Sequence, residues 1–324
     1  MGVRPFFSGP MVDEVALAAR VQPLVRGFAG SVPDAPALRR LTADYGIDAA
    51  TMTLRECLRA APEGALSRRL EGRTPPVVPT RLAPTLVVVP TLFFREHPEL
   101  GGDGALIAEV ARSFGLRTVR APIESLGGVG ENAARLLQCL EEIDGPIWVA
   151  TLSKGSLEMK EALRLAAGRE VLGRLSGWVN ISGVLGGSRI VDRALRTPLH
   201  RAFWNAFLRL RGGTGRALSD MAREGPHARA ELRLPDHVEV VSVVALPLPC
   251  HLGADTLRYF QRLEPFGPND GFVSYGDAVA PGAVWPIWGA DHYLRTPELS
   301  RVLHALLGHV AEQGGRTLAL AGTR

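Results

Sequence analysis

The chain has 324 residues, 46% of them hydrophobic and 22% charged, and its 37 basic and 33 acidic residues give a net charge of +4. Such a composition is ordinary for a globular protein that forms one large α/β domain or two smaller ones. The mild charge and the lack of a compact basic run with interleaved aromatic residues argue against a nucleic-acid-binding protein.

Three cysteines, Cys57, Cys139 and Cys250, are odd in number and far apart. This spacing argues against a disulfide framework and against a thiolate metal site. Residues 1–20 lack the continuous apolar segment of a secretory signal, and the longest apolar stretch, 82–94, is too short to cross a bilayer. We therefore expect a cytoplasmic protein without integral membrane association.

The first 78 residues predict a helical N-terminal extension. Apolar residues recur at helical spacing through Val15 to Val25 and again through Leu54 to Leu66. The proline-rich segment Glu71–Pro79 then predicts a linker to the next element. Docking on the core, shaping a cleft and building a homodimer interface are all open roles for this extension.

From residue 79 onward the pattern changes to alternating strands and helices, which predicts a mostly parallel sheet covered on both faces. We assign this α/β core to residues 79–187 and 236–324. The predicted strands are Thr85–Thr91, Leu116–Pro122, Pro146–Leu152, Leu175–Ile181, His237–Leu246 and Val284–Trp288. The predicted helices are Gly104–Phe114, Glu131–Ile143, Leu157–Ala167, Asp255–Leu263 and Pro297–Gly314.

Between residues 188 and 235 the alternation fails. Two arginine-rich segments, Arg189–Arg211 and Gly215–Arg233, predict helices that form a cap inserted in the core. Aromatic residues gather in the first of them. These residues are Phe203, Trp204 and Phe207. They serve either in packing or in substrate contacts.

The segment Thr151-Leu152-Ser153-Lys154-Gly155 follows an apolar strand and precedes an amphipathic helix. Small residues two positions before and after a serine are typical of a sharp strand-to-helix turn that exposes the hydroxyl in a cleft. Thr151 stands where the strict pattern has glycine. A serine at such a junction also serves as a plain helix N-cap, so the motif needs partners before it predicts catalysis.

A reactive serine needs a histidine and a carboxylate, and loops at the carboxyl ends of strands are where an α/β fold places them. His292 follows the last predicted strand, and His251, which follows the strand before it, is the rival candidate. Asp270 lies in a Pro-Asn-Asp-Gly turn between those two strands, with Asp277 and Asp291 as its rivals. The order Ser153, Asp270, His292 is the one expected of hydrolases with this turn.

With these three motifs the chain resembles the α/β-hydrolase family, in its lipase and esterase branch, from about Thr85 to the C-terminus. The resemblance implies that Ser153 is the nucleophile, His292 the general base and then acid, and Asp270 the carboxylate that orients the imidazole. It also implies an oxyanion hole made by the backbone N–H of Lys154 and another near Leu92 or Phe93. We expect the Lys154 side chain to face solvent.

The resemblance implies a serine hydrolase that cleaves a small-molecule ester with an apolar acyl part. A thioesterase or acyltransferase on the same residues, and a catalytically silent binding protein of this fold, are alternatives. Gly127, Gly128 and Gly130 precede a helix but lie too far from a strand for a dinucleotide site. We expect no cofactor, and no metal because histidine and carboxylate pairs at ligand spacing are lacking.

Overall fold

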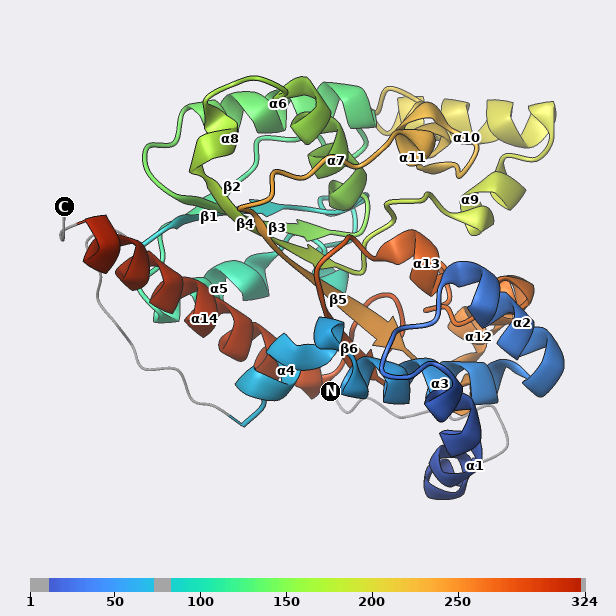
Figure 1. The fold of residues 1–324 in the computed structure, drawn as a ribbon. Coiled ribbons are helices and arrows are strands. Elements are labelled where there is room, and N and C mark those ends of the chain that lie inside the picture. The colour runs from blue at the N-terminus through green and yellow to red at the C-terminus, as the bar shows by residue number, and fades with distance from the viewer. Residues whose placement is uncertain (1–11, 73–82, 322–324) are drawn as a thin grey trace.

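The computed structural model describes residues 12–72 and 83–321 (Figure 1). The predicted linker therefore lies mostly outside the described residues. At the centre is a six-stranded sheet in the order β2-β1-β3-β4-β5-β6, and every neighbouring pair is parallel. The strands are β1 (Thr85–Val89), β2 (Thr118–Arg120), β3 (Ile147–Leu152), β4 (Leu175–Ile181), β5 (Glu239–Leu246) and β6 (Ala283–Trp288). The predicted mostly parallel α/β sheet is confirmed.

The sheet is buried on both faces, as its nearly continuous runs of apolar, β-branched residues require. In β1 all five residues are buried, and the last four alternate between two hydrophobic clusters. Leu86 and Val88 belong to one cluster, whereas Val87 and Val89 belong to the other. This two-residue period follows from the pleat of a strand, and it places one cluster on each side of the sheet.

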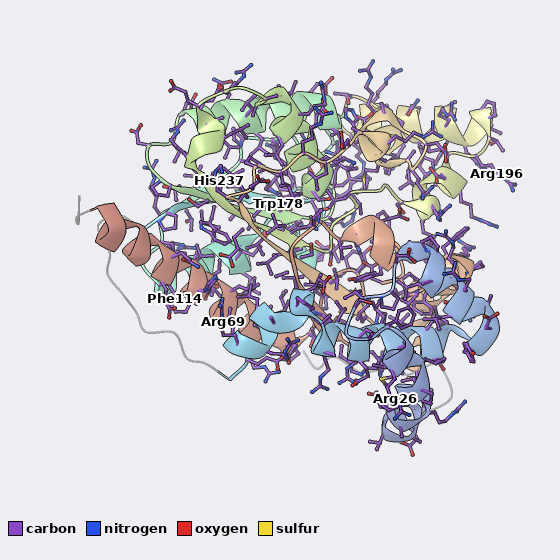
Figure 2. All side chains as sticks on the ribbon, viewed as in Figure 1. Arg26, Arg69, Phe114, Trp178, Arg196 and His237 are labelled. Carbon is purple, nitrogen blue, oxygen red and sulfur yellow. The ribbon has the colours of Figure 1, made fainter. Side chains whose placement is uncertain are left out.

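Helices cover both faces (Figure 1). On one side α6 (Val129–Glu141), α7 (Gly155–Leu165) and the short α8 (Val171–Arg174) pack over the strands. The other side is covered by α5 (Ala105–Ser113) and α14 (Pro297–Ala321), which contact each other, and by α4 (Ala65–Leu70). Trp178 on β4 is fully buried within the first of these layers (Figure 2).

The N-terminal segment is helical, as predicted, with α1 (Glu14–Gly27), α2 (Ala35–Tyr45) and α3 (Ile47–Ala60) before η1 (Pro62–Gly64) and α4. Asp13 and Asp34 accept a backbone N–H in the first turns of α1 and α2, which favours helix starts at these points. Leu54 and Leu58 of α3 share a hydrophobic cluster with the far end of the sheet. These helices thus cover the sheet beside β6.

Residues 182–238, between β4 and β5, contain α9 (Arg189–Ala194), α10 (Pro198–Leu210), η3 (Ser219–Met221) and α11 (Pro226–Arg229). The prediction of one helix over Arg189–Arg211 is wrong, because Pro198 ends the first helix and starts a second one that is capped by Thr197. The predicted helix over Gly215–Arg233 is also wrong. Gly225 and Pro226 interrupt that segment, and most of it is turns.

The remaining elements connect the core strands. They are η2 (Pro98–Leu100), η4 (Pro249–His251), α12 (Ala254–Leu263), η5 (Glu264–Phe266) and α13 (Tyr275–Ala278). Within the described ranges, no helix combines the length and the apolar character needed to span a membrane.

Candidate active site

Ser153 lies at the apex of a tight turn between β3 and α7. Its φ is +48°, a left-handed conformation that a serine adopts at a cost. The turn is fixed from both sides, because the Ser153 N–H donates to Ile181 O at 2.9 Å and the Ser156 hydroxyl donates to Ser153 O at 2.7 Å. At Gly155 a Cβ would lie 2.9 Å from Val89 O, so the turn requires glycine there.

Thr151 takes the position that the strict sequence pattern gives to glycine. Its side chain is fully buried, and its hydroxyl accepts the indole N–H of Trp178 at 2.9 Å. The strand therefore accommodates a larger residue here because the neighbouring strand offers a buried donor that needs a partner.

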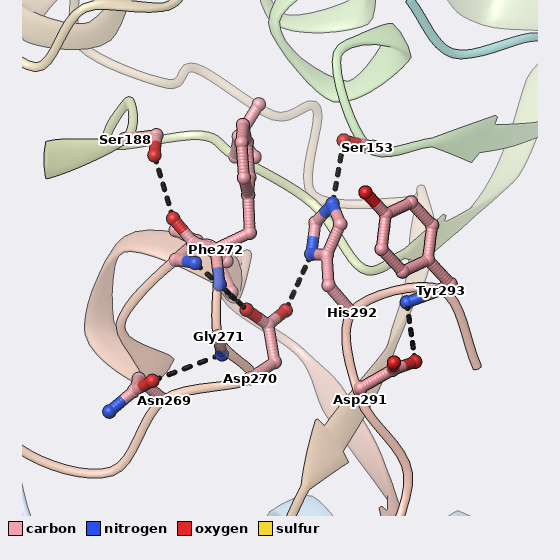
Figure 3. A network of polar contacts seen from close by, with 12 residues as sticks. Ser153, Ser188, Asn269, Asp270, Gly271, Phe272, Asp291, His292 and Tyr293 are labelled. Carbon is pink, nitrogen blue, oxygen red and sulfur yellow. Dashed lines mark hydrogen bonds and ion pairs between the residues drawn. The ribbon is translucent and has the colours of Figure 1, made fainter. Parts of the chain in front are cut away.

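Three side chains from different loops form one hydrogen-bonded chain (Figure 3). Ser153 Oγ lies 2.9 Å from His292 Nε2, and His292 Nδ1 lies 2.7 Å from Asp270 Oδ2. Because a carboxylate only accepts, Nδ1 carries the proton and Nε2 is free to accept the serine proton. Both His292 and Asp270 are buried, so water competes little for these contacts.

The loop before β6 holds Asp270 in place through its backbone. Asp270 Oδ1 accepts the N–H groups of Phe272 and Val273, both at 2.8 Å, which leaves Oδ2 for the histidine. The His292 N–H also donates to Asp270 O at 2.9 Å. The carboxylate and the imidazole thus keep a fixed mutual orientation.

The rival candidates have other partners. His251 Nε2 donates to Glu14 Oε1 at 2.8 Å, and its Nδ1 accepts the Leu248 N–H, so this histidine anchors helix α1. Asp277 pairs with Arg223 at 3.4 Å, and Asp291 pairs with Arg295 at 3.1 Å. The structure brings Asp270, and neither rival, to the Nδ1 atom of His292.

Backbone donors surround the serine. The N–H groups of Leu92, Phe93 and Lys154 donate to no acceptor among the described residues. Phe93 has a φ of +61°, which marks a second strained turn, at the end of β1. Leu92 and Phe93 line the same cavity as Ser153, and Lys154 follows the serine directly.

The Lys154 side chain is buried, which contradicts the expectation that it faces solvent. It is 1% exposed and forms an ion pair with Glu158, one turn along α7. Asn132 on α6 donates to the same carboxylate at 2.7 Å. Burial raises the pKa of Glu158 although Lys154 and Asn132 lower it. The sequence did offer a signal, since this Lys-Glu pair has the four-residue spacing of neighbours on a helix.

The ion pair continues into a polar network that reaches the loop after β1. Asn132 exchanges hydrogen bonds of 2.9–3.0 Å with the backbone of Glu124. Ser125, the next residue, accepts the Arg95 N–H at 3.3 Å. The network thus connects the turn at Ser153 to the loop that carries Leu92 and Phe93.

A cavity of about 620 Å³ opens at Ser153. Ser182 and His292 also line it, and the rest of its wall is mainly apolar. The apolar side chains come from the loop after β1, from the end of β3, from α5, from the segment between β4 and β5 and from α14, and they include Leu92, Phe93, Leu106, Ile107, Leu152, Leu218, Met221, Leu299 and Leu303.

His292 also lines a second cavity of about 540 Å³, and Ser153 does not line it. Phe93, Phe272 and His292 border both cavities. Of the three aromatic residues predicted on α10, Trp204 lines this second cavity. Phe203 and Phe207 pack against Trp204 with ring centroids 5.6 and 5.7 Å away, and they line neither cavity.

At the glycine-rich start of α6, a side chain of the protein itself accepts a free backbone N–H. Asp220 Oδ2 accepts the Val129 N–H at 2.8 Å, so a carboxylate stands where a phosphate would bind a helix N-terminus. In the part of the chain that the structure describes, no group of three or more His, Cys, Asp or Glu side chains is placed to hold a metal ion.

No protein-family model and no curated protein matches the chain. Solved structures do match. The metagenomic carboxyl esterase MGS0156 aligns with a TM-score of 0.55 and 22% identity over 75% of this chain and 80% of that one. Mature Bacillus licheniformis lipase BlEst2 aligns with a TM-score of 0.53 and 18% identity over 71% and 94%.

The chain combines a parallel sheet covered by helices on both faces with a serine at a strained turn after a central strand. This combination and the structural matches show that the chain has the α/β-hydrolase fold. The fold implied by the sequence resemblance is confirmed.

Proposed function

We propose that the protein is a serine hydrolase that cleaves a carboxylic ester through an acyl-enzyme on Ser153. The observation that carries this proposal is the hydrogen-bonded chain from Ser153 Oγ through His292 to Asp270, at the mouth of an apolar cavity. The matched structures are named as an esterase and a lipase, which supports the same class of reaction.

In the first half of the reaction Ser153 Oγ attacks the ester carbonyl while His292 Nε2 takes the hydroxyl proton. The carbonyl oxygen becomes an oxyanion that accepts the N–H of Lys154 and that of Leu92 or Phe93. Each well-aimed donor contributes about a hundredfold or more in rate. Asp270 stabilises the imidazolium that forms. The intermediate then collapses, and His292 gives its proton to the departing alcohol.

In the second half, His292 takes a proton from a water molecule that attacks the acyl carbon. The intermediate that forms expels Ser153 Oγ, which regains its proton from His292, and the carboxylic acid leaves. Each half thus returns the histidine to its neutral form, with Nδ1–H still donated to Asp270.

In this proposal each of the two cavities holds one part of the ester. The first cavity contains Ser153 and has a mainly apolar wall, which fits an apolar acyl chain. The second is bordered by His292, the group that protonates the departing alcohol, so the alcohol part lies there.

We assign residues 188–235 the role of a cap over this cleft. Leu218 and Met221 from this segment line the acyl cavity, and Val191 and Trp204 line the alcohol cavity. Residues 79–187 and 236–324 form the catalytic core in this assignment, and residues 1–78 are its N-terminal extension.

The test is labelling with a fluorophosphonate probe, which reacts with an activated serine. We expect the protein to be labelled and Ser153→Ala to be unlabelled and inactive on 4-nitrophenyl esters. Ser182→Ala is the matched control, because Ser182 lines the same cavity and its hydroxyl has no hydrogen-bond partner among the described residues. Folded protein that resists the probe would contradict the proposal and favour a catalytically silent binding protein.

A further inference from the structure

Helix α10 exposes a stripe of apolar side chains. Leu199, Phe203 and Leu210 are 77%, 60% and 87% exposed, and Ala206 between them is exposed too. Their spacing of four, three and four residues places them on one side of the helix. Exposed apolar side chains gathered in this way mark a contact surface.

The opposite side of α10 holds the helix in place. Leu208 is fully buried in a cluster that includes Leu126 and Val129, and Trp204 and Phe207 pack against the same cluster. The helix is therefore already anchored to the core. The apolar stripe faces outward, and its side chains stay largely exposed although the Phe203 ring contacts those of Trp204 and Phe207.

The segment that carries the stripe is also rich in positive charge. Five exposed arginines on and beside α10 form no ion pair with a described residue, and they are Arg193, Arg196, Arg201, Arg209 and Arg211. Arg196 lies at the outer edge of the molecule (Figure 2). The helix itself, Pro198–Leu210, contains no acidic residue.

This charge is concentrated in one segment. Residues 188–235 contain ten arginines and four acidic residues, a net charge of +6, whereas the rest of the chain has 27 basic and 29 acidic residues, a net charge of −2. A basic segment on an otherwise slightly acidic protein points to an acidic partner.

We infer that the α10 stripe, with the exposed arginines of the same segment, docks on the surface of an anionic lipid bilayer. Leu199, Phe203 and Leu210 would enter the boundary between headgroups and acyl chains, and the arginines would contact lipid phosphates. A second copy of the chain fits this surface poorly. A two-fold contact across the stripe would bring the same arginines of both copies together.

The proposed alcohol cavity lies along the other side of the same helix. Trp204 follows Phe203 on α10 and lines the cavity beside His292. A protein held at a bilayer by this helix would therefore have that cavity close to the lipid. The inference goes beyond the proposed hydrolase activity and holds whether or not Ser153 reacts.

The experiment is cosedimentation of the full chain with vesicles of phosphatidylglycerol and phosphatidylcholine, and with vesicles of phosphatidylcholine alone. We expect binding to the anionic vesicles to be at least about tenfold tighter, because each arginine near such a surface contributes about fivefold. Added salt is expected to weaken this binding, since it screens exposed charges.

Two variants test the two parts of the surface. Leu199→Ser with Leu210→Ser and, separately, Arg209→Gln with Arg211→Gln, which flank Leu210, are each expected to weaken binding about tenfold or more. The matched controls are Val15→Ser, at an apolar site that is 82% exposed on α1, and Arg258→Gln, an exposed arginine on α12. Both controls are expected to bind as the unchanged protein does.

Equal binding to neutral and anionic vesicles, or no binding to either, would overturn the inference. So would dimers in solution that dissociate in the Leu199→Ser, Leu210→Ser variant, since they would make a second copy the occupant. Because neither of these leucines lines a cavity, hydrolysis of a soluble ester reports separately on the proposed activity.

Discussion

The parallel sheet and the segment between β4 and β5 are built in different ways. In the sheet, continuous buried strands position Ser153, Asp270 and His292 at one edge through loops fixed by hydrogen bonds. The segment over residues 188–235 consists of short helices and turns, with exposed arginines on its surface. The proposed reacting groups therefore depend on the rigid part of the molecule, the sheet and its loops, whereas the irregular part, residues 188–235, supplies some of the wall around the proposed substrate.

The strongest test of this contrast is Asp270→Asn in the rigid part. The amide no longer fixes the tautomer of His292 or stabilises its charge, and we expect kcat to fall by about 10⁴. Steady-state kinetics on a 4-nitrophenyl ester measures this. Asp291→Asn serves as the control, because Asp291 adjoins His292 but pairs with Arg295. A comparable loss in the control would contradict the assignment of Asp270.

Next in size is the effect of the buried ion pair beside Ser153. Lys154→Met leaves the Glu158 carboxylate buried without its cation, and we expect a loss of about 3 kcal/mol in the free energy of unfolding. The double variant Lys154→Met, Glu158→Leu is expected to be more stable than the single variant. Urea unfolding measures both. Equal stability of Lys154→Met and the unchanged protein would show that the pair is dispensable.

The same pair predicts a pH dependence. Burial raises the pKa of Glu158 above its ordinary value of 4.5, even beside Lys154. Between pH 4.5 and the folded pKa, the folded protein holds a proton that the unfolded chain has lost, so this group makes stability fall as pH rises across that interval. Removing the ammonium raises that pKa further. We therefore expect Lys154→Met to lose more stability on going from about pH 5 to about pH 8 than Glu158→Gln does.

A smaller effect is expected at Thr151. Thr151→Val removes the acceptor of the buried Trp178 N–H and should cost about 1–2 kcal/mol of stability. Thr151→Ser retains a hydroxyl and is the control. Thermal unfolding compares the two variants. If the valine variant matched the serine variant, the hydrogen bond would not explain why this position accepts a residue larger than glycine.

The smallest effect lies in the irregular segment. Trp204→Ala widens the proposed alcohol cavity without touching the reacting groups, so we expect kcat to change by less than about threefold. KM is expected to rise for esters of bulky alcohols and to stay constant for methyl esters. Steady-state kinetics on both kinds of ester measures the change. A large fall in kcat for the methyl ester would contradict the distinction between the sheet with its loops, which holds the proposed reacting groups, and residues 188–235.

Much of the fold could be predicted because its signals are local. Buried strands such as β3 and β4 are short apolar runs between turns, and the predicted strand Leu175–Ile181 matches β4 in both bounds. The position of Ser153 between a strand and a helix was visible in the same way. Residues 188–235 gave no such signal, since their helices are short and set by Pro198 and Pro226.

The contacts within the site depend on the folded chain. The sequence offered three aspartates, and the backbone donors of Phe272 and Val273, which orient Asp270, exist only once its turn has formed. The burial of Lys154 was missed because a charged side chain is rarely buried without a partner. Asn132, which completes that site, comes from a separate helix.

The proposed reaction requires an acyl-enzyme on Ser153, and this intermediate can be trapped. The protein is mixed with excess 4-nitrophenyl octanoate and quenched with acid during turnover, and its peptides are analysed by mass spectrometry. We predict an octanoyl group on the peptide that contains Ser153 and on no peptide of Ser153→Ala. Hydrolysis that depends on the protein but leaves no acyl group on Ser153, or leaves one on another residue, would contradict the claim.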